Sequence, residues 1–270
     1  MNPMNKPLAL YSIVFVTMAL TFWHPSLAWL NPLSILILLF GTTWLWRVEG
    51  YSLYDLGLHR VASWHRNVFL GISIGLVLPT SLAVAQTATG WITLVPASWS
   101  LANLLGAVTK AILVVAVEEL VFRGYFLQHF SFTRGTKQAI LLSSLLWAFL
   151  HLPNMVSSGI SLTSLAMGMI TFVLIGVALS IGFLRTDNTL WLPLSLHLSY
   201  NLSYSFLGVF AAATYHAPPW LVGHPAWAPE SGLLGVLLAS AILVTVWWTT
   251  VQDTRIKHSE ENRQTLSNTA

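Results

Sequence analysis

The sequence predicts an all-α fold, a polytopic membrane helix bundle of about eight transmembrane helices. Two observations lead to this prediction. The 270-residue chain is 55% hydrophobic and only 8% charged, whereas soluble globular proteins carry about 25% charged residues. In addition, five long stretches contain no Asp, Glu, Lys or Arg: residues 8–46, 67–109, 138–184, 188–229 and 231–252. A soluble enzyme, a disordered chain and a fibrous repeat protein are therefore excluded.

Each membrane-spanning helix needs about 20 mostly apolar residues. The expected spans, in chain order, are residues 8–23, 27–46, 66–89, 101–127, 137–152, 160–184, 189–210 and 231–252. His24-Pro25 ends the first helix, Pro32 lies in the first turns of the second, and Pro153-Asn154 stops the fifth. We expect one transmembrane domain over residues 1–252 and no cleaved signal peptide, because no small-residue cleavage site follows the first helix.

The polar segments complete the domain organisation. Residues 47–66 are expected to form a short amphipathic helix on the cytoplasmic surface, ending near Gly57. Residues 253–270 are expected to form a polar, disordered cytoplasmic tail. With a net charge of +3 and no basic run interleaved with aromatic residues, the chain shows no sign of nucleic-acid binding. The lack of Cys excludes disulfides, thiolate catalysis and Cys-ligated zinc.

The positions of Lys and Arg predict the orientation in the membrane. Loops on one side of the expected helices contain no Lys or Arg: residues 24–26, 90–100, 153–159 and 211–230. The basic residues that flank the other ends of the helices are Lys6, Arg47, Arg60, Arg66, Arg134, Lys137, Arg185, Arg255, Lys257 and Arg263. The positive-inside rule then places both termini in the cytoplasm, as an even number of helices requires.

Four charged residues remain inside the expected fourth span: Lys110, Glu118, Glu119 and Arg123. A charge at the centre of a bilayer costs about 2.5–3.5 kcal/mol even on the mildest scale, so these residues must be paired, protonated or functional. Glu119 and Arg123 are four residues apart and can form an ion pair. A purely structural role explains this pair as well as a functional role does. Glu118 points about 100° away from Glu119 around the helix and is left without that partner. We expect the Lys110 side chain either to extend toward the membrane surface or to line the outer part of a cavity.

Two histidines lie inside other expected helices. His151 follows Trp147 by four residues in the fifth helix, and His197 precedes Asn201 by four residues in the seventh. A single His in an apolar helix is more often a hydrogen-bonded interior residue than a catalytic one. Two of them, together with an unpaired Glu and an Asn, favour one internal polar cavity, because each group needs a polar partner in the membrane.

This set of groups suits peptide-bond hydrolysis. A carboxylate and a neutral imidazole on either side of a water molecule can activate it for attack on a carbonyl. A second His and an Asn can supply donors where the oxyanion develops. No cofactor is required for this chemistry. Glu118, His151 and His197 also resemble a His₂Glu zinc site, which leaves a divalent metal such as zinc open, although an HExxH pattern is absent. A proton-coupled transporter that uses Glu118 and the histidines as a relay is a further alternative.

Other intramembrane protease chemistries find no support. Asp55, Asp187 and Asp253 all lie at or beyond helix ends, which excludes an aspartyl pair. A GxSxG string does occur at residues 71–75, but a nucleophile elbow needs a strand-to-helix turn, and this string lies inside the expected third helix. We interpret it as a chance match that allows close helix packing.

Three short motifs carry a resemblance to a known family. Glu118 to Arg123 reads EELVFR and matches EExxxR, the first motif of the CAAX-processing and bacteriocin-processing (CPBP, also ABI) glutamate intramembrane proteases, which include the type II CAAX prenyl endopeptidases. Trp147 to His151 approaches the second motif, FxxxH, with Trp in place of Phe, and His197 to Asn201 meets the third, HxxxN. The chain resembles this family over about residues 100–205.

The resemblance implies roles for these residues. Glu118 is the expected general base, assisted by His151, while His197 and Asn201 are expected to form the oxyanion site. Glu119, Arg123 and Trp147 are expected to support them. Family members cleave prenylated CAAX tails in eukaryotes, and bacterial ones process peptides, protect against them or serve as scaffolds.

We therefore expect an intramembrane endopeptidase in a bacterial cell (inner) membrane. Its expected partners are the lipid bilayer and a membrane-associated peptide or protein substrate, with no nucleic acid. The alternative is a non-catalytic membrane scaffold or a peptide-immunity protein with the same fold.

Overall fold

The computed structural model describes residues 5–23 and 30–267, which are mostly helical. The long helices, in chain order, are α1 (Asn5–Trp23), α2 (Leu30–Val48), α3 (Trp64–Ala88), α4 (Leu101–Glu119), α6 (Thr136–Ser157), α7 (Leu162–Arg185), α8 (Trp191–Phe210) and α10 (Leu233–Ser267). Shorter elements are η2 (Leu53–Leu56), η3 (Leu120–Leu127), α5 (Gln128–Arg134) and α9 (Pro219–Val222). Each long helix overlaps one of the eight expected segments.

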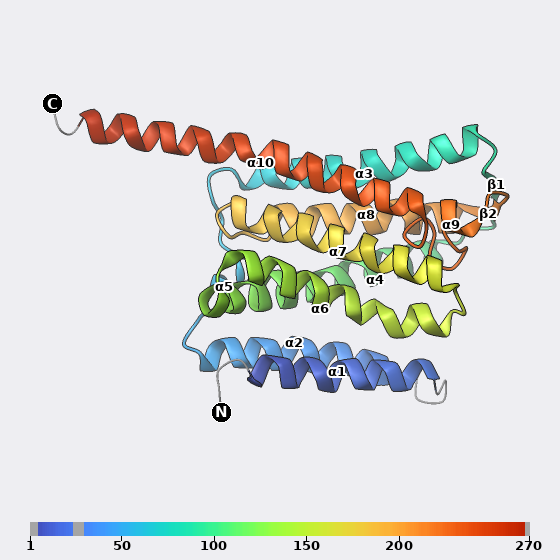
Figure 1. Ribbon diagram of the computed structural model, residues 1–270, viewed down its shortest axis with the longest axis horizontal. Coiled ribbons are helices and arrows are strands. Elements are labelled where there is room, and N and C mark those ends of the chain that lie inside the picture. The colour runs from blue at the N-terminus through green and yellow to red at the C-terminus, as the bar shows by residue number, and fades with distance from the viewer. Residues whose placement is uncertain (1–4, 24–29, 268–270) are drawn as a thin grey trace.

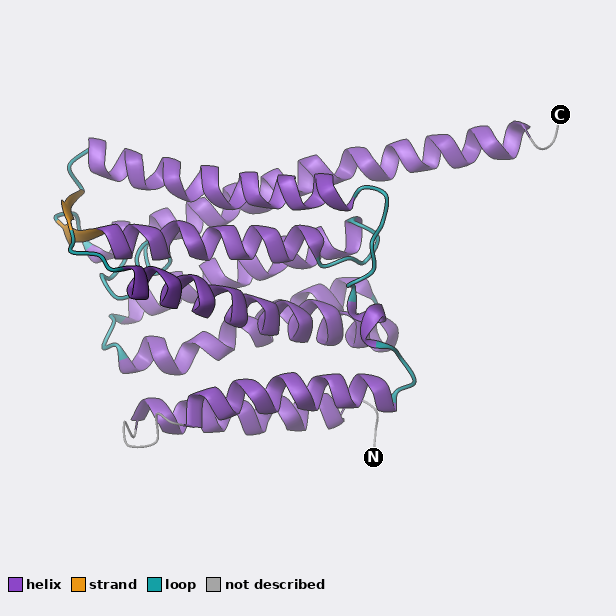
Figure 2. Cartoon of the chain, turned by 180° about the vertical axis from the view of Figure 1, so that it is seen from behind, coloured by secondary structure: helices purple, strands orange, loops and turns teal. Residues whose placement is uncertain are grey.

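The helices lie side by side in a bundle (Figures 1 and 2). At one edge, α1 and α2 form a hairpin that packs against α6. At the other edge, α3 packs on α8 and α10 packs on α7. Between these edges lie α4, α6, α7 and α8, and the predicted site residues belong to α4, η3, α6 and α8. This central position surrounds their polar side chains with protein on several sides.

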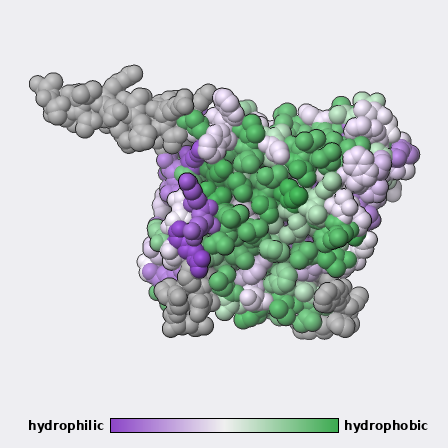
Figure 3. Space-filling view, viewed as in Figure 1, coloured by the Kyte–Doolittle hydropathy of each residue, from purple (hydrophilic) through white to green (hydrophobic). Residues whose placement is uncertain are grey.

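Four of the described helices are long and apolar enough to cross a membrane: Trp64–Ala88, Thr136–Ser157, Leu162–Arg185 and Leu233–Val251. Shorter apolar stretches occur in α1 and α2, at Leu8–Thr17 and Leu33–Val48. Figure 3 shows hydrophobic residues over most of the visible face, with hydrophilic residues toward its two ends. The chain is therefore an integral membrane protein with four candidate membrane-spanning helices. That all eight long helices cross the membrane stays a prediction.

The expected helix over residues 101–127 is more complex than predicted. α4 ends at Glu119, a π-helical stretch follows over Leu120–Leu127, and α5 continues to Arg134. π-helical turns are rare and often occur at functional sites. Here the wider turn begins directly after the two adjacent glutamates, in a segment without Pro, so tertiary packing decides its geometry.

Three other expectations are wrong in detail. Pro153 does not stop the fifth helix: α6 continues through it to Ser157, because Pro removes only one backbone donor. Residues 47–66 do not form an amphipathic helix, since only η2 is helical between the end of α2 and the start of α3. Gly57 does end η2, in the left-handed conformation at φ 96°. The expected disordered tail is also wrong, because α10 continues as a helix to Ser267.

A small antiparallel sheet lies at one end of the bundle. β1 (Ile92–Pro96) pairs with β2 (Ala211–Tyr215), with Ile92 opposite Tyr215 and Pro96 opposite Ala211. β1 precedes α4, and β2 directly continues α8. Both strands were expected to be loops, because such short apolar runs carry too little periodicity to be assigned as strands. The sheet brings the first turns of α4 and the last turns of α8 to the same end of the bundle (Figure 1).

The glycines of the GxSxG string provide close packing between α3 and α8. A Cβ atom added at Gly71 would meet Ser195 and the backbone of Leu192, and one at Gly75 would meet Ser199 and the backbone of Leu196. Small residues let helix backbones approach each other in this way. The interpretation of this string as a packing feature is confirmed.

Candidate active site

Glu119 lies in a buried ion-pair cluster. Its Oε1 accepts a hydrogen bond of 2.9 Å from Nη1 of Arg123 and lies 2.8 Å from Nδ1 of His197. The side chains of Glu119 and Arg123 are both 0% exposed. Burying a charge is tolerated when it is paired and hydrogen-bonded, and here one carboxylate oxygen meets two donors. Glu119 is thus occupied in holding Arg123 and His197 in place.

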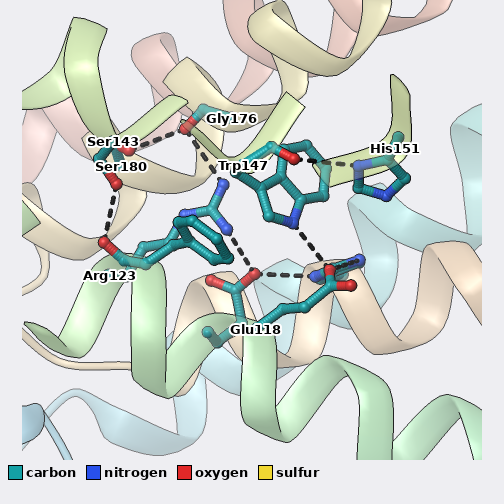
Figure 4. Close-up of polar contacts among 10 residues, drawn as sticks. Glu118, Arg123, Ser143, Trp147, His151, Gly176 and Ser180 are labelled. Carbon is teal, nitrogen blue, oxygen red and sulfur yellow. Dashed lines mark hydrogen bonds and ion pairs between the residues drawn. The ribbon is translucent and has the colours of Figure 1, made fainter. Parts of the chain in front are cut away.

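Arg123 is held from three sides. Besides Glu119, its Nη2 donates a 3.4 Å hydrogen bond to the carbonyl of Gly176 on α7, and its guanidinium lies 4.8 Å from the ring centroid of Trp147. Figure 4 shows the guanidinium of Arg123 directed toward the carbonyl of Gly176. The predicted Glu119–Arg123 pair is therefore present, and it also ties α4 and η3 to α6 and α7.

Glu118 has a different environment from Glu119. Its Oε2 accepts a 2.7 Å hydrogen bond from Nε1 of Trp147, and it lies 3.8 Å from Nε2 of His197. Its side chain is 18% exposed, whereas that of Glu119 is fully buried. Glu118 therefore points away from the Arg123 pair, as the helical spacing predicted, and it lines a cavity.

His151 lies beside Trp147 on α6. Its Nδ1 is 3.0 Å from the carbonyl oxygen of Trp147, and its ring stacks on Phe172 with the centroids 4.2 Å apart. A carbonyl oxygen only accepts hydrogen bonds, so this contact requires the proton on Nδ1. In the neutral ring Nε2 is then a free acceptor. Figure 4 shows Trp147 directing its indole nitrogen to Glu118 while its carbonyl meets His151.

Glu118, Trp147, His151, His197 and Asn201 all line one cavity of about 270 Å³, the Glu118 pocket. Asn201 lies one helical turn beyond His197 on α8. The structure thus brings together the residues that the three motifs predicted.

The Glu118 pocket adjoins two further cavities. One, of about 360 Å³, is called the vestibule here. It is lined by Ala107, Lys110, Ala111, Val114, Tyr200, Asn201, Tyr204, Ser205 and Glu230. The second, of about 420 Å³, lies under the α1–α2 hairpin and is lined mainly by apolar side chains, together with Glu118 and His151. Lys110 lines both of them, in agreement with its expected place in the outer part of a cavity.

Glu230 was not singled out from the sequence. It is the one charged residue between positions 188 and 252 of the sequence. It lies between β2 and α10, where it accepts a 2.9 Å hydrogen bond from the Tyr200 hydroxyl and lines both the vestibule and the Glu118 pocket. Burial raises the pKa of Glu230 above its usual range. Its isolation in an uncharged stretch was the signal that could have identified it.

The zinc hypothesis concerns Glu118, His151 and His197, which line one pocket. Within residues 5–23 and 30–267, no group of three or more His, Cys, Asp or Glu side chains could hold a metal ion. Nδ1 of His197 contacts Glu119 and Nδ1 of His151 contacts a carbonyl oxygen, so in both rings Nε2 is the nitrogen left facing the pocket. Glu118, His151 and His197 line the same pocket without converging as ligands.

The comparisons with known proteins agree with this geometry. Residues 97–203 match the family described as Type II CAAX prenyl endopeptidase Rce1-like. These residues form an Rce1-like domain. A search of curated proteins finds no match to the chain. The Rce1-like domain includes α4, α6, α7 and most of α8, with every residue of the three motifs. Glu230 lies outside it. The match to this family suggests CAAX-type intramembrane protease activity.

Proposed function

We propose that this protein is an intramembrane endopeptidase that hydrolyses a peptide bond in a membrane-associated peptide or protein. The observation that carries the proposal is the contrast between the two adjacent glutamates. Glu119 is fully buried and neutralised by Arg123, whereas Glu118 lines a cavity together with two histidines and an Asn. A general base must reach its water, and of these two carboxylates Glu118 has that access.

The proposed reaction starts with a water molecule between Glu118 and His151. Glu118 accepts a proton from the water while Nε2 of His151 accepts a hydrogen bond that orients it. The oxygen bonds to the carbonyl carbon of the substrate and forms a tetrahedral oxyanion. Glu118 then returns the proton to the leaving nitrogen as the carbon–nitrogen bond breaks. The products are a carboxylic acid and an amine, and no metal is used.

His197 and Asn201 are proposed to stabilise the oxyanion. The contact with Glu119 makes Nδ1 of His197 a donor. Nε2 of His197 lies 3.8 Å from Oε2 of Glu118, and when the ring carries both protons it donates into the Glu118 pocket. Together with the Asn201 amide it provides two donors at the place where charge develops.

The proposed placement in the membrane follows from the basic residues. All eight long helices cross the bilayer, and both termini face the cytoplasm of a bacterial cell. The tightly packed Phe122, Tyr125 and Phe126, all 0% exposed, lie on the side of the site toward α5 and the basic loops. They keep that side of the site closed to water.

A matched comparison in proteoliposomes tests the proposal. Wild type, Glu118→Ala, Glu118→Gln and a control variant, Glu49→Gln, are incubated with a library of membrane-proximal peptides, and products are identified by mass spectrometry. Glu49 binds Tyr125 and His129 away from the pocket, so it controls for loss of a carboxylate. Cleavage by wild type and Glu49→Gln, but by neither Glu118 variant, supports the proposal.

Two results would contradict it. Cleavage by Glu118→Ala at the wild-type rate would show that Glu118 is not the base. Loss of wild-type cleavage on adding a chelator, with recovery on adding zinc, would show that a metal takes part. If folded wild type cleaves none of the peptides, the non-catalytic scaffold or immunity role takes precedence, and Glu118→Gln should then retain the biological effect.

A further inference from the structure

The vestibule opens toward the end of the bundle that carries the β1–β2 sheet. Its α4 residues, Ala107 to Val114, lie in the middle of α4, on the β1 side of Glu118. Its α8 residues, Tyr200 to Ser205, lie between His197 and β2. Glu230 joins them from the segment between β2 and α10. The two cavities adjoin, because five residues line both the vestibule and the Glu118 pocket: Val114, Tyr200, Asn201, Tyr204 and Glu230.

Exposure along α8 rises in the same direction. Leu192 and Leu196, on the side toward Arg185, are 0% exposed, and His197 is 4% exposed. Beyond His197, Asn201 and Ser205 are half-buried. On α4, Lys110 is exposed, whereas Glu119 is 0% exposed. Along α4 and α8, burial therefore decreases from the site toward the β1–β2 end.

The basic residues lie at the opposite end of the bundle. Arg47 lies in the last turn of α2, Arg134 ends α5 and Arg185 ends α7, and these helix ends lie together away from the sheet (Figure 1). The loops at the sheet end, residues 90–100 and 211–230, contain no Lys or Arg. The positive-inside rule assigns the basic end to the cytoplasm, so the β1–β2 end faces the extracytoplasmic side.

We propose that substrates reach the Glu118 pocket from the extracytoplasmic side through the vestibule, and that they are peptide segments presented at the outer face of the membrane. This inference rests on the proposed protease function. Prenylated CAAX tails in the cytoplasm would meet the closed, basic end of the bundle instead. The substrate class is therefore secreted or outward-facing peptides.

The lining of the vestibule suits a peptide. Six of its nine lining residues are polar: Lys110, Tyr200, Asn201, Tyr204, Ser205 and Glu230. They include one cation and one carboxylate, as well as hydroxyl and amide groups that match the donors and acceptors of a peptide backbone. A lipid chain would leave these groups unpaired at a substantial cost. The polar path leads directly to Asn201 and the Glu118 pocket.

Cysteine labelling tests the direction of access, because the chain contains no Cys. Three single-Cys variants are compared: Ser205→Cys in the vestibule, Ser98→Cys on the exposed segment after β1, and Thr136→Cys at the exposed start of α6. Each is treated with a membrane-impermeant maleimide in intact bacterial cells and in inverted membrane vesicles. Labelling is read by mass shift, and the fold is checked by size-exclusion chromatography in detergent.

We expect Ser205→Cys and Ser98→Cys to be labelled in intact cells, and Thr136→Cys only in inverted vesicles. Labelling of Ser205→Cys together with Thr136→Cys would overturn the proposal, as would an unlabelled Ser205→Cys when Ser98→Cys is labelled from outside. Labelling does not depend on catalysis. If wild type cleaves peptides but the single-Cys variants show the opposite labelling pattern, the inferred direction of access is wrong and the proposed function still holds. If the variants are labelled as expected but wild type cleaves no peptide, the proposed function is wrong and the direction of access still holds.

Discussion

The indole Nε1 of Trp147 donates a hydrogen bond of 2.7 Å to Oε2 of Glu118. Trp147 stands at the position where the second motif of the family has Phe, and a phenyl ring cannot donate such a bond. The substitution therefore gives this chain a hydrogen-bond donor on the proposed general base. It fixes the orientation of the Glu118 carboxylate, while the same residue accepts from His151 through its backbone carbonyl.

We expect Trp147→Phe to keep the fold and lower the cleavage rate. Phe fills most of the space of the indole but removes the donor, and a hydrogen bond to a charged group contributes about 1.5–3 kcal/mol. This corresponds to a loss of about ten- to a hundredfold in kcat/KM. The control is Trp191→Phe, which removes the indole bond to the carbonyl of His59 outside the pocket. Equal losses for the two variants would contradict a specific role for Trp147.

Asn201→Ala should reduce kcat with little change in KM. Its amide is proposed to contact the oxyanion and not the ground-state substrate, and removal of one such donor typically costs 10²–10³-fold in kcat. Steady-state kinetics with a cleaved library peptide measure the effect. Asn103→Ala, at an exposed position near the start of α4, is the control. A rise in KM with an unchanged kcat would assign Asn201 to substrate binding instead.

Arg123→Met should destabilise the protein strongly, by about 3–5 kcal/mol, because it leaves Glu119 charged and buried without its guanidinium partner. The double variant Glu119→Gln/Arg123→Met removes both charges, and we expect it to recover a large part of that loss. Thermal unfolding of each variant in detergent gives the comparison. Destabilisation by the double variant equal to the sum of the two single variants would show that the pair is not coupled.

Gly75→Ala should lower the unfolding temperature, because the added Cβ would collide with Ser199 and the Leu196 carbonyl on α8. Gly106→Ala is the matched control on α4, where a Cβ atom would meet nothing within 4 Å. There, Ala should be neutral or stabilising by up to about 1 kcal/mol, since Gly is unfavourable inside a helix. A harmless Gly75→Ala would mean that α3 and α8 can separate without loss of stability.

The site was predictable to the extent that it depends on helical spacing. Residues four apart share one face of a helix, so the Glu119–Arg123 pair and the separate direction of Glu118 followed from their positions alone. The polar residues in apolar helices were expected to gather, because isolated polar groups are costly in a membrane. The contacts of Trp147 and His197 with the two glutamates agree with that expectation.

What the sequence by itself determined is the approximate place of the eight long helices and the end at which the basic residues lie. These features depend on local apolar length and on charge, which can be read along the chain. Only the tertiary structure decided the indole bond to Glu118, the entry of Glu230 into the cavity and the direction in which the vestibule opens. These three features join residues that are far apart in the chain, and helix packing with the pairing of β1 and β2 brings them together.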